Sequence, residues 1–330
     1  MKIKVTNLVL LIAMMFGFQV FAQNRANVEK LNELSKQFET KWNEAQQRVV
    51  KYAVENNLKI WHETEDGRVM EMVDVREGQP VYYITDNRGA DKTTRVDQLW
   101  PGGSLNLDYS GEGYSQLGEW DAGHVRKTHQ EFMDGSTSRA TPQDGNYATH
   151  FHATHVAGTM IAAGVNPEAK GALYGGNLKY WQWSADDSEM ATAGANGLEI
   201  SNHSYGFLAG WNYDNGTWKW WGNSAISTDE DYKFGFYNND ARGWDQIAYN
   251  APNYLIVKSA GNDRGEGPSD AGNGKADVDG GEDGYDCIGT RGVAKNILTV
   301  GAVYEVDVYE GPQSVVMSDF SCWGPADDGR

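Results

Sequence analysis

A chain of 330 residues with 40% hydrophobic and 12% aromatic residues is long enough for one large domain plus a smaller one. This composition is typical of globular rather than disordered proteins. The formal net charge of -18 argues against nucleic acid as a partner, because the phosphates would be repelled.

Residues 1–22 have the pattern of a secretory signal peptide. Lys2 and Lys4 precede an almost wholly apolar run over 8–21, and Val20 to Ala22 provides a cleavage site with a small residue. The run is short for a membrane span, which favours export with cleavage over an N-terminal anchor. No later stretch is long and apolar enough to cross a bilayer, so we expect no stable membrane span after cleavage.

Residues 23–97 predict a small α+β unit. Apolar side chains recur in steps of three and four from Val28 to Trp42, which indicates an amphipathic helix. Two strand-like runs follow at 68–75 and 80–85. The polar stretch over 86–97 indicates a domain boundary.

Residues 98–330 predict an α/β domain. Short apolar runs typical of strands alternate with helical segments, of which the clearest is 156–163. The expected strands are 116–120, 178–183, 198–200, 254–257 and 297–303. This alternation predicts a mostly parallel sheet with helices on both faces, and functional residues at the carboxyl ends of its strands. Residues 207–245 form a Trp- and Tyr-rich insert, which we expect to pack as a surface loop, with a platform for glycans or peptides as the alternative.

Three short strings carry the functional signal. Gly118 to Gly123 reads GEWDAG and contains Asp121; His152 to Thr159 reads HATHVAGT; and Val257 to Asn262 reads VKSAGN. Their order, an aspartate, a histidine and an amide, is the order found in the subtilisin type of Ser-His-Asp machinery. On these strings the chain resembles the subtilisin-like (subtilase) serine peptidases of the secreted bacterial type.

The resemblance implies a role for each residue. His152 would be the general base, Asp121 would orient its imidazole, and the side-chain amide of Asn262 would donate to the oxyanion. The backbone of Ser204, Tyr205 and Gly206 would bind an extended peptide or protein substrate. Considered alone, Asp121 also fits a residue that forms a turn at the end of a strand. His152, considered alone, also fits a histidine buried in the core. One departure is Ala153, which stands where the family's HGTH string has glycine.

The family's serine lies in a GTSMA-like string after an FSxxGP segment. Phe320 to Pro325 reads FSCWGP, and no GTSMA string occurs in the sequence. The resemblance therefore implies a catalytic serine beyond residue 330, and a 330-residue chain that is inactive alone. It also implies that residues 23–97 are a prodomain that inhibits until cleaved, although an ordinary N-terminal subdomain fits the pattern as well. A pseudoprotease that binds peptides or glycans without cleaving them is the alternative function.

Metal and redox chemistry stay open. The spacing of His150, His152 and His155 does not match the helical HExxH zinc motif. Carboxylates alternating with glycines over 263–286 suit calcium, and a solvated acidic loop explains them equally well. We expect no required cofactor. In an exported protein Cys287 and Cys322 can form a disulfide, but their spacing in the sequence does not show whether they do. The resemblance implies that the protein is secreted by a bacterium, or that it is located in the periplasm or on the cell surface.

Overall fold

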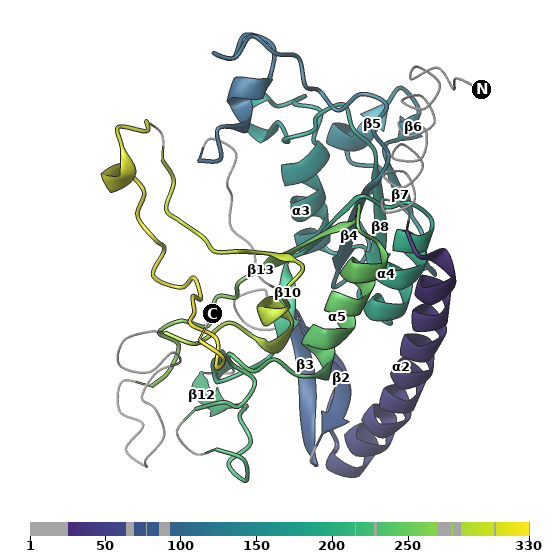
Figure 1. The fold of residues 1–330 in the computed structure, drawn as a ribbon, viewed down its shortest axis with the longest axis vertical. Coiled ribbons are helices and arrows are strands. Elements are labelled where there is room, and N and C mark those ends of the chain that lie inside the picture. The colour runs from purple at the N-terminus through teal and green to yellow at the C-terminus, as the bar shows by residue number, and fades with distance from the viewer. Residues whose placement is uncertain are drawn as a thin grey trace, which may run out of the picture.

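A computed structural model describes residues 26–63, 69–76, 78–85, 93–214, 216–227, 230–268, 279, 285–306 and 308–329 (Figure 1). The expected signal peptide, residues 1–22, lies outside these ranges. Within them, no helix combines the length and the apolar composition that crossing a bilayer requires.

The centre of the fold is a sheet of six parallel strands, in the order β14-β13-β9-β4-β8-β7. The strands are β4 (Leu117–Asp121), β7 (Ala140–Pro142), β8 (Leu178–Gln182), β9 (Ile200–His203), β13 (Leu255–Ser259) and β14 (Leu298–Val300). The strand order reverses at β4, because later strands add on both of its sides. Ligands bind outside the carboxyl ends of the strands at such a switch point, and β4 ends there at Asp121.

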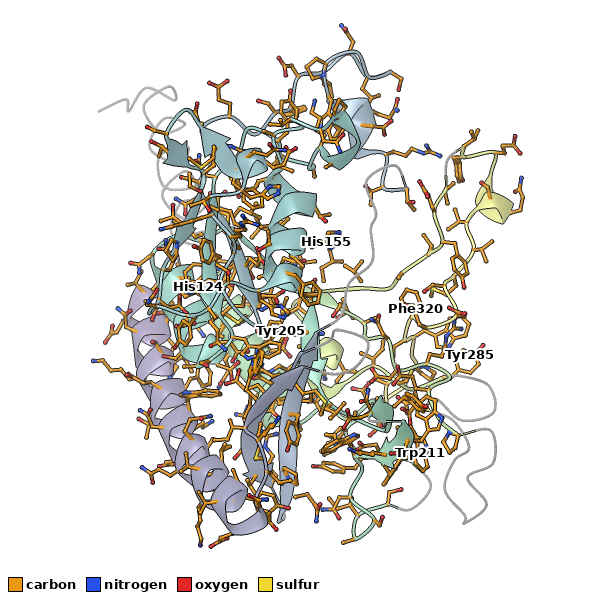
Figure 2. The ribbon with its side chains drawn as sticks, turned by 180° about the vertical axis from the view of Figure 1, so that it is seen from behind. His124, His155, Tyr205, Trp211, Tyr285 and Phe320 are labelled. Carbon is orange, nitrogen blue, oxygen red and sulfur yellow. The ribbon has the colours of Figure 1, made fainter. Side chains whose placement is uncertain are left out.

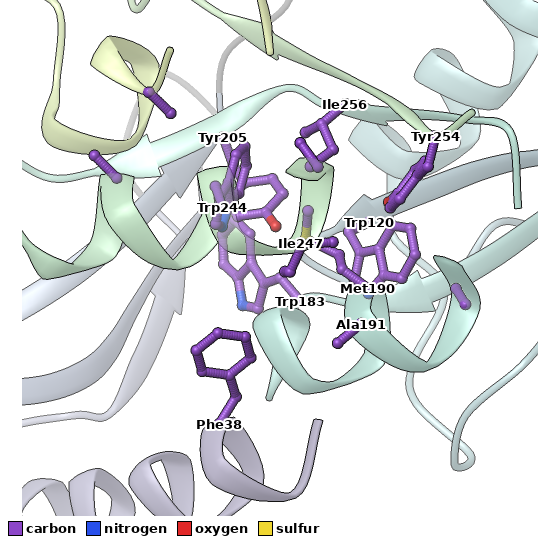
Figure 3. Packing of buried hydrophobic residues seen from close by; sticks show 14 of the residues in the cluster. Phe38, Trp120, Trp183, Met190, Ala191, Tyr205, Trp244, Ile247, Tyr254 and Ile256 are labelled. Atoms are coloured by element: carbon purple, nitrogen blue, oxygen red, sulfur yellow. The ribbon is translucent and has the colours of Figure 1, made fainter. Parts of the chain in front are cut away.

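Helices cover both faces of this sheet, as the sequence predicts. Helix α3 (Phe151–Ile161) packs on one face, where its small residues meet Leu117, Leu178 and Tyr180. Helices α4 (Asp186–Ala195) and α5 (Asn239–Asn250) cover the other. Figure 3 shows the core on that second face, with Trp120, Trp183 and Trp244 gathered between the sheet and the two helices.

The N-terminal unit is the predicted helix with a small sheet. Helix α2 (Val28–Asn56) lies along α4 and α5 (Figure 1). Strands β1 (Trp61–Glu63), β2 (Val69–Arg76) and β3 (Gln79–Thr85) form an antiparallel sheet, which β10 (Tyr205–Phe207) completes as a fourth strand. Leu31, Leu34 and Phe38 of α2 belong to the same apolar cluster as Trp120 and Trp244. The N-terminal unit and the α/β domain therefore share one core.

The aromatic insert is more ordered than the expected surface loop. It contains a hairpin of β11 (Trp211–Asp214) and β12 (Thr217–Trp220), and Trp211 is buried against Trp220. Trp244 was wrongly assigned to this loop, because it lies in α5 and is fully buried in the core. The remaining short elements are β5 (Met133–Asp134), β6 (Thr137–Ser138) and the 3-10 turns Val96–Leu99, Gln130–Phe132, Pro167–Ala169, Thr290–Val293 and Pro312–Ser314.

Candidate active site

Asp121 and His152 form a buried hydrogen-bonded pair. His152 Nδ1 lies 2.9 Å from Asp121 Oδ1 and 2.7 Å from Oδ2. Asp121 is 1% exposed and His152 is 6% exposed, so little water competes for this contact. A carboxylate only accepts, so the proton belongs on Nδ1 and Nε2 is left as the basic ring nitrogen.

Helix α3 begins early enough to carry His152. The expected helix starts at residue 156, but α3 starts at Phe151 because His150 caps it: His150 Nδ1 accepts the backbone N–H of His152 at 3.2 Å. Gly123 lets this helix end approach β4, since a Cβ there would lie 2.9 Å from Ala148 O. Ala153 lies inside the helix, so alanine at this departure from the family string carries no backbone strain.

Asn262 lies in the loop that follows β13. The turn before it needs a glycine, because Gly261 has φ of 109° and a Cβ there would come within 2.9 Å of Asp263 Oδ2. Strands β13 and β4 belong to one parallel sheet, so the loop of Asn262 leaves the same edge at which Asp121 lies. The third predicted residue thus shares a sheet edge with the other two.

The expected substrate segment, Ser204 to Gly206, leads into β10, and its side chains bond within the protein. Tyr205 is 1% exposed, and its hydroxyl donates to Asp186 Oδ2 at 2.7 Å. Ser204 Oγ accepts the side-chain amide of Asn202. A peptide would therefore bind to the main chain of β10. In this structure that main chain is paired with β3, with Gly206 opposite Ile84.

All three strings lie within a stretch of the chain that matches one family model. A model described as the subtilase family matches residues 87–330, most of the chain. The chain belongs to the subtilase family. No curated protein and no solved structure matched it. The family match gives this subtilase its α/β fold and the class of serine peptidases that act on peptides or proteins. It begins after β3, so the N-terminal unit lies outside the matched range.

A buried serine–histidine pair in this subtilase is structural. Ser201 Oγ lies 2.8 Å from His203 Nε2, and Tyr205 and Tyr254 extend the chain of hydrogen bonds. Both Ser201 and His203 are fully buried, so no substrate reaches them. Burial lowers the pKa of His203, with Lys258 and Arg291 adding to the effect, which keeps the ring neutral.

The described residues hold no group of three or more His, Cys, Asp or Glu side chains arranged for a metal ion. His155 lies on α3 (Figure 2), and burial, with His152 as a further cause, lowers the pKa of its ring. Most of the acidic stretch considered for calcium, residues 269–278 and 280–284, lies outside the described residues.

Glu119 is a buried carboxylate beside Asp121 that the sequence analysis did not single out. It lies two positions before Asp121 on β4, on the same side of the strand. It is fully buried, and neither carboxylate oxygen has a hydrogen-bond partner among the described residues. Burial and the neighbouring Asp121 raise the pKa of Glu119 well above its usual value. The feature that pointed to Glu119 was a glutamate in the middle of a strand whose other residues are buried.

We expect Glu119→Gln to stabilise the protein increasingly as the pH rises. The raised pKa means that the folded state holds this proton more tightly than the unfolded state does. The wild type is therefore most stable below the unfolded pKa of about 4.5, and it loses stability as the pH rises toward the folded pKa. Urea unfolding at pH 5 and pH 8 should show the variant gaining about 1 kcal/mol or more over the wild type across that interval. If the unfolding free energies of variant and wild type differed by the same amount at both pH values, the raised pKa of Glu119 would be refuted.

Proposed function

We propose that this subtilase is the precursor of an exported bacterial serine endopeptidase in which His152 is the general base and Asp121 its orienting partner. The observation that carries the proposal is the buried contact of His152 Nδ1 with both oxygens of Asp121. The nucleophile is a serine in the chain that follows residue 330. The mechanism requires no cofactor.

The chemistry follows from this arrangement. His152 Nε2 takes the proton of the serine hydroxyl as the oxygen attacks the scissile carbonyl carbon. The side-chain N–H of Asn262 donates to the oxyanion that forms, an interaction typically worth about 2.7–4 kcal/mol in the transition state. Asp121 stabilises the imidazolium, which then gives its proton to the leaving amine. The serine ester that remains is hydrolysed by water in the same way.

The N-terminal unit occupies the strand that the substrate would use. Leu208 N–H donates to Tyr82 O at 2.5 Å, and the antiparallel register alternates, so the next hydrogen-bonded pair is Gly206 with Ile84. A substrate that pairs with the main chain of Gly206 must displace Ile84 or find another edge of β10. This competition supports residues 23–97 as an inhibitory prodomain.

We expect Ile84→Pro to weaken that inhibition in the uncleaved precursor. Proline removes the Ile84 N–H, so one hydrogen bond to β10 is lost and the ring disturbs the pairing. Peptide hydrolysis by uncleaved full-length precursor should rise roughly tenfold, in line with about 1–2 kcal/mol of lost contact. Thr85→Pro is the matched control, because its N–H points away from β10. Equal activity of wild type and Ile84→Pro precursor would count against competition at β10.

The proposed function is tested on the product of the complete gene. Purified protein should cleave a quenched fluorescent peptide after its N-terminal unit is removed, lose activity to a serine-directed sulfonyl fluoride, and keep it in a zinc chelator. The 330-residue chain should be inactive. A full-length product that binds peptides without cleaving them would instead support the pseudoprotease alternative.

A further inference from the structure

A C-terminal segment clamps the loop that carries Asn262. Cys322 N–H donates to Gly261 O at 3.0 Å, and Cys322 Sγ contacts Asp263 Oδ2 at 3.7 Å, so one residue contacts the loop on both sides of Asn262. Arg264 extends this contact: its N–H donates to Phe320 O at 3.3 Å, and its guanidinium lies 4.3 Å from the centre of the Trp323 ring. The position of Asn262 therefore depends on where Cys322 is held.

Cys287 is the residue placed to hold it. Cys287 and Cys322 are 0% and 1% exposed, and they share an apolar cluster with Ala209, Phe234 and Ala260. The neighbouring Cys322 is the largest influence on the pKa of the Cys287 thiol and lowers it. The two residues are thiols and not a disulfide in this structure. The segments around them also meet through Tyr285 and Trp323, whose rings stack 5.2 Å apart. Figure 2 shows Tyr285 and Phe320 on the same side of the molecule.

We propose that Cys287 and Cys322 are joined by a disulfide in the exported protein, and that this bond fixes the loop of Asn262. The inference rests on the export and on the oxyanion role proposed above. A disulfide would replace a weak thiol–thiol contact by a covalent link between segments that are far apart in sequence. It would act on the site through Cys322 N–H and Gly261 O, which makes Cys322 a positioning residue rather than a catalytic one.

The bond forms by thiol–disulfide exchange with a disulfide-bearing oxidant of the export compartment. The Cys287 thiolate attacks one sulfur of that disulfide and expels the other as a thiol, which leaves a mixed disulfide. The Cys322 thiolate then attacks Cys287 Sγ and expels the second thiol. Two thiol protons leave the protein, and the oxidant is reduced to two thiols. Since both cysteines are buried in the folded chain, the exchange takes place during folding.

The first test counts thiols and needs no enzymatic activity. Full-length protein collected from the export compartment is denatured and alkylated with iodoacetamide, with and without prior reduction, and its tryptic peptides are weighed. We expect Cys287 and Cys322 to be unalkylated before reduction and alkylated after it, together with a tryptic peptide pair linking Cys287 to Cys322. Alkylation of both Cys287 and Cys322 without reduction would overturn the proposal, whatever the peptidase assay shows.

The second test asks whether the bond holds the loop. Reductant during refolding should lower the Tm of the wild type by roughly 5 °C or more, and should leave the Tm of Cys287→Ser/Cys322→Ser unchanged. The double variant should lose kcat while KM stays near the wild-type value, because the amide of Asn262 acts in the transition state. A double variant with wild-type kcat would overturn the positioning role of Cys322. A wild-type protein that has the disulfide but no peptidase activity would contradict the proposed function and not the disulfide.

Discussion

Asp121→Asn is expected to lower kcat/KM of the full-length peptidase by about 10⁴-fold at neutral pH. His152 Nδ1 now meets both carboxylate oxygens, at 2.9 and 2.7 Å. An asparagine donates its side-chain N–H to Nδ1, so the other tautomer is favoured and the proton moves to Nε2. His152 then cannot accept the serine proton. The loss should fall in kcat, since the substrate main chain binds elsewhere.

A second histidine–aspartate pair provides the control. His124 Nε2 lies 2.7 Å from Asp144 Oδ1, and both side chains are largely buried, as in the Asp121–His152 pair. Asp144→Asn should lower the thermal stability and leave kcat/KM within a few-fold of the wild type. If Asp121→Asn and Asp144→Asn lowered kcat/KM equally, Asp121 would have no special role in orienting the base.

Replacing Arg291 is expected to be the most destabilising single change away from the catalytic pair. Its guanidinium is 5% exposed, and it bonds Asp186 at 2.5 Å and Asp187 at 2.9 Å at the start of α4. It also lies 5.0–5.2 Å from the ring centres of Phe207, Tyr83 and Trp244. Arg291→Ala leaves two carboxylates without their cation, which should cost about 3–5 kcal/mol of unfolding free energy.

The pH dependence of that loss tests its cause. Burial raises the pKa of Asp187 to about 6, and Arg291 opposes the rise. A raised pKa means that stability is fully present below the unfolded pKa and is lost as the pH rises through the folded pKa. Without Arg291 the pKa rises further, so Arg291→Ala should be most destabilised above pH 6 and partly recover near pH 4.

Arg48→Ala is the matched control for Arg291→Ala. Arg48 also bonds an aspartate, Asp74 at 2.8 Å, but its side chain is 48% exposed. An exposed pair of this kind contributes about 0–1 kcal/mol. Urea unfolding at pH 7.5 should therefore separate the two variants clearly. Equal losses would mean that burial of the Arg291 cluster is not what makes it important.

Local patterns in the sequence predicted most of the α/β fold and the main site pair. The steps of three and four over 28–42 appear as α2, and the apolar runs appear as the strands of the parallel sheet. Asp121 and His152 were predicted as partners from short strings alone, and the hydrogen bonds between them are observed. Such strings predict a site because a functional group restricts the residue types at the positions beside it.

Interactions between distant segments were not predictable in the same way. Nothing in the string around Arg291 names Asp186 as its partner, and only the folded chain places Ile84 beside Gly206. The start of α3 was missed because the cap is a histidine, a side chain outside the usual set of capping residues. Glu119 was missed because strand periodicity places a side chain on a face without saying whether that face is polar or apolar.

The proposed mechanism requires that His152, held by Asp121, activates a serine. Full-length wild type, His152→Ala and Asp121→Asn are each treated with a fluorophosphonate, and the modified residue is located by mass spectrometry of tryptic peptides. We expect one labelled serine, C-terminal to residue 330, with labelling abolished in His152→Ala and strongly slowed in Asp121→Asn. Labelling that proceeds equally fast in His152→Ala, or peptide cleavage by wild type with no serine labelled, would contradict it.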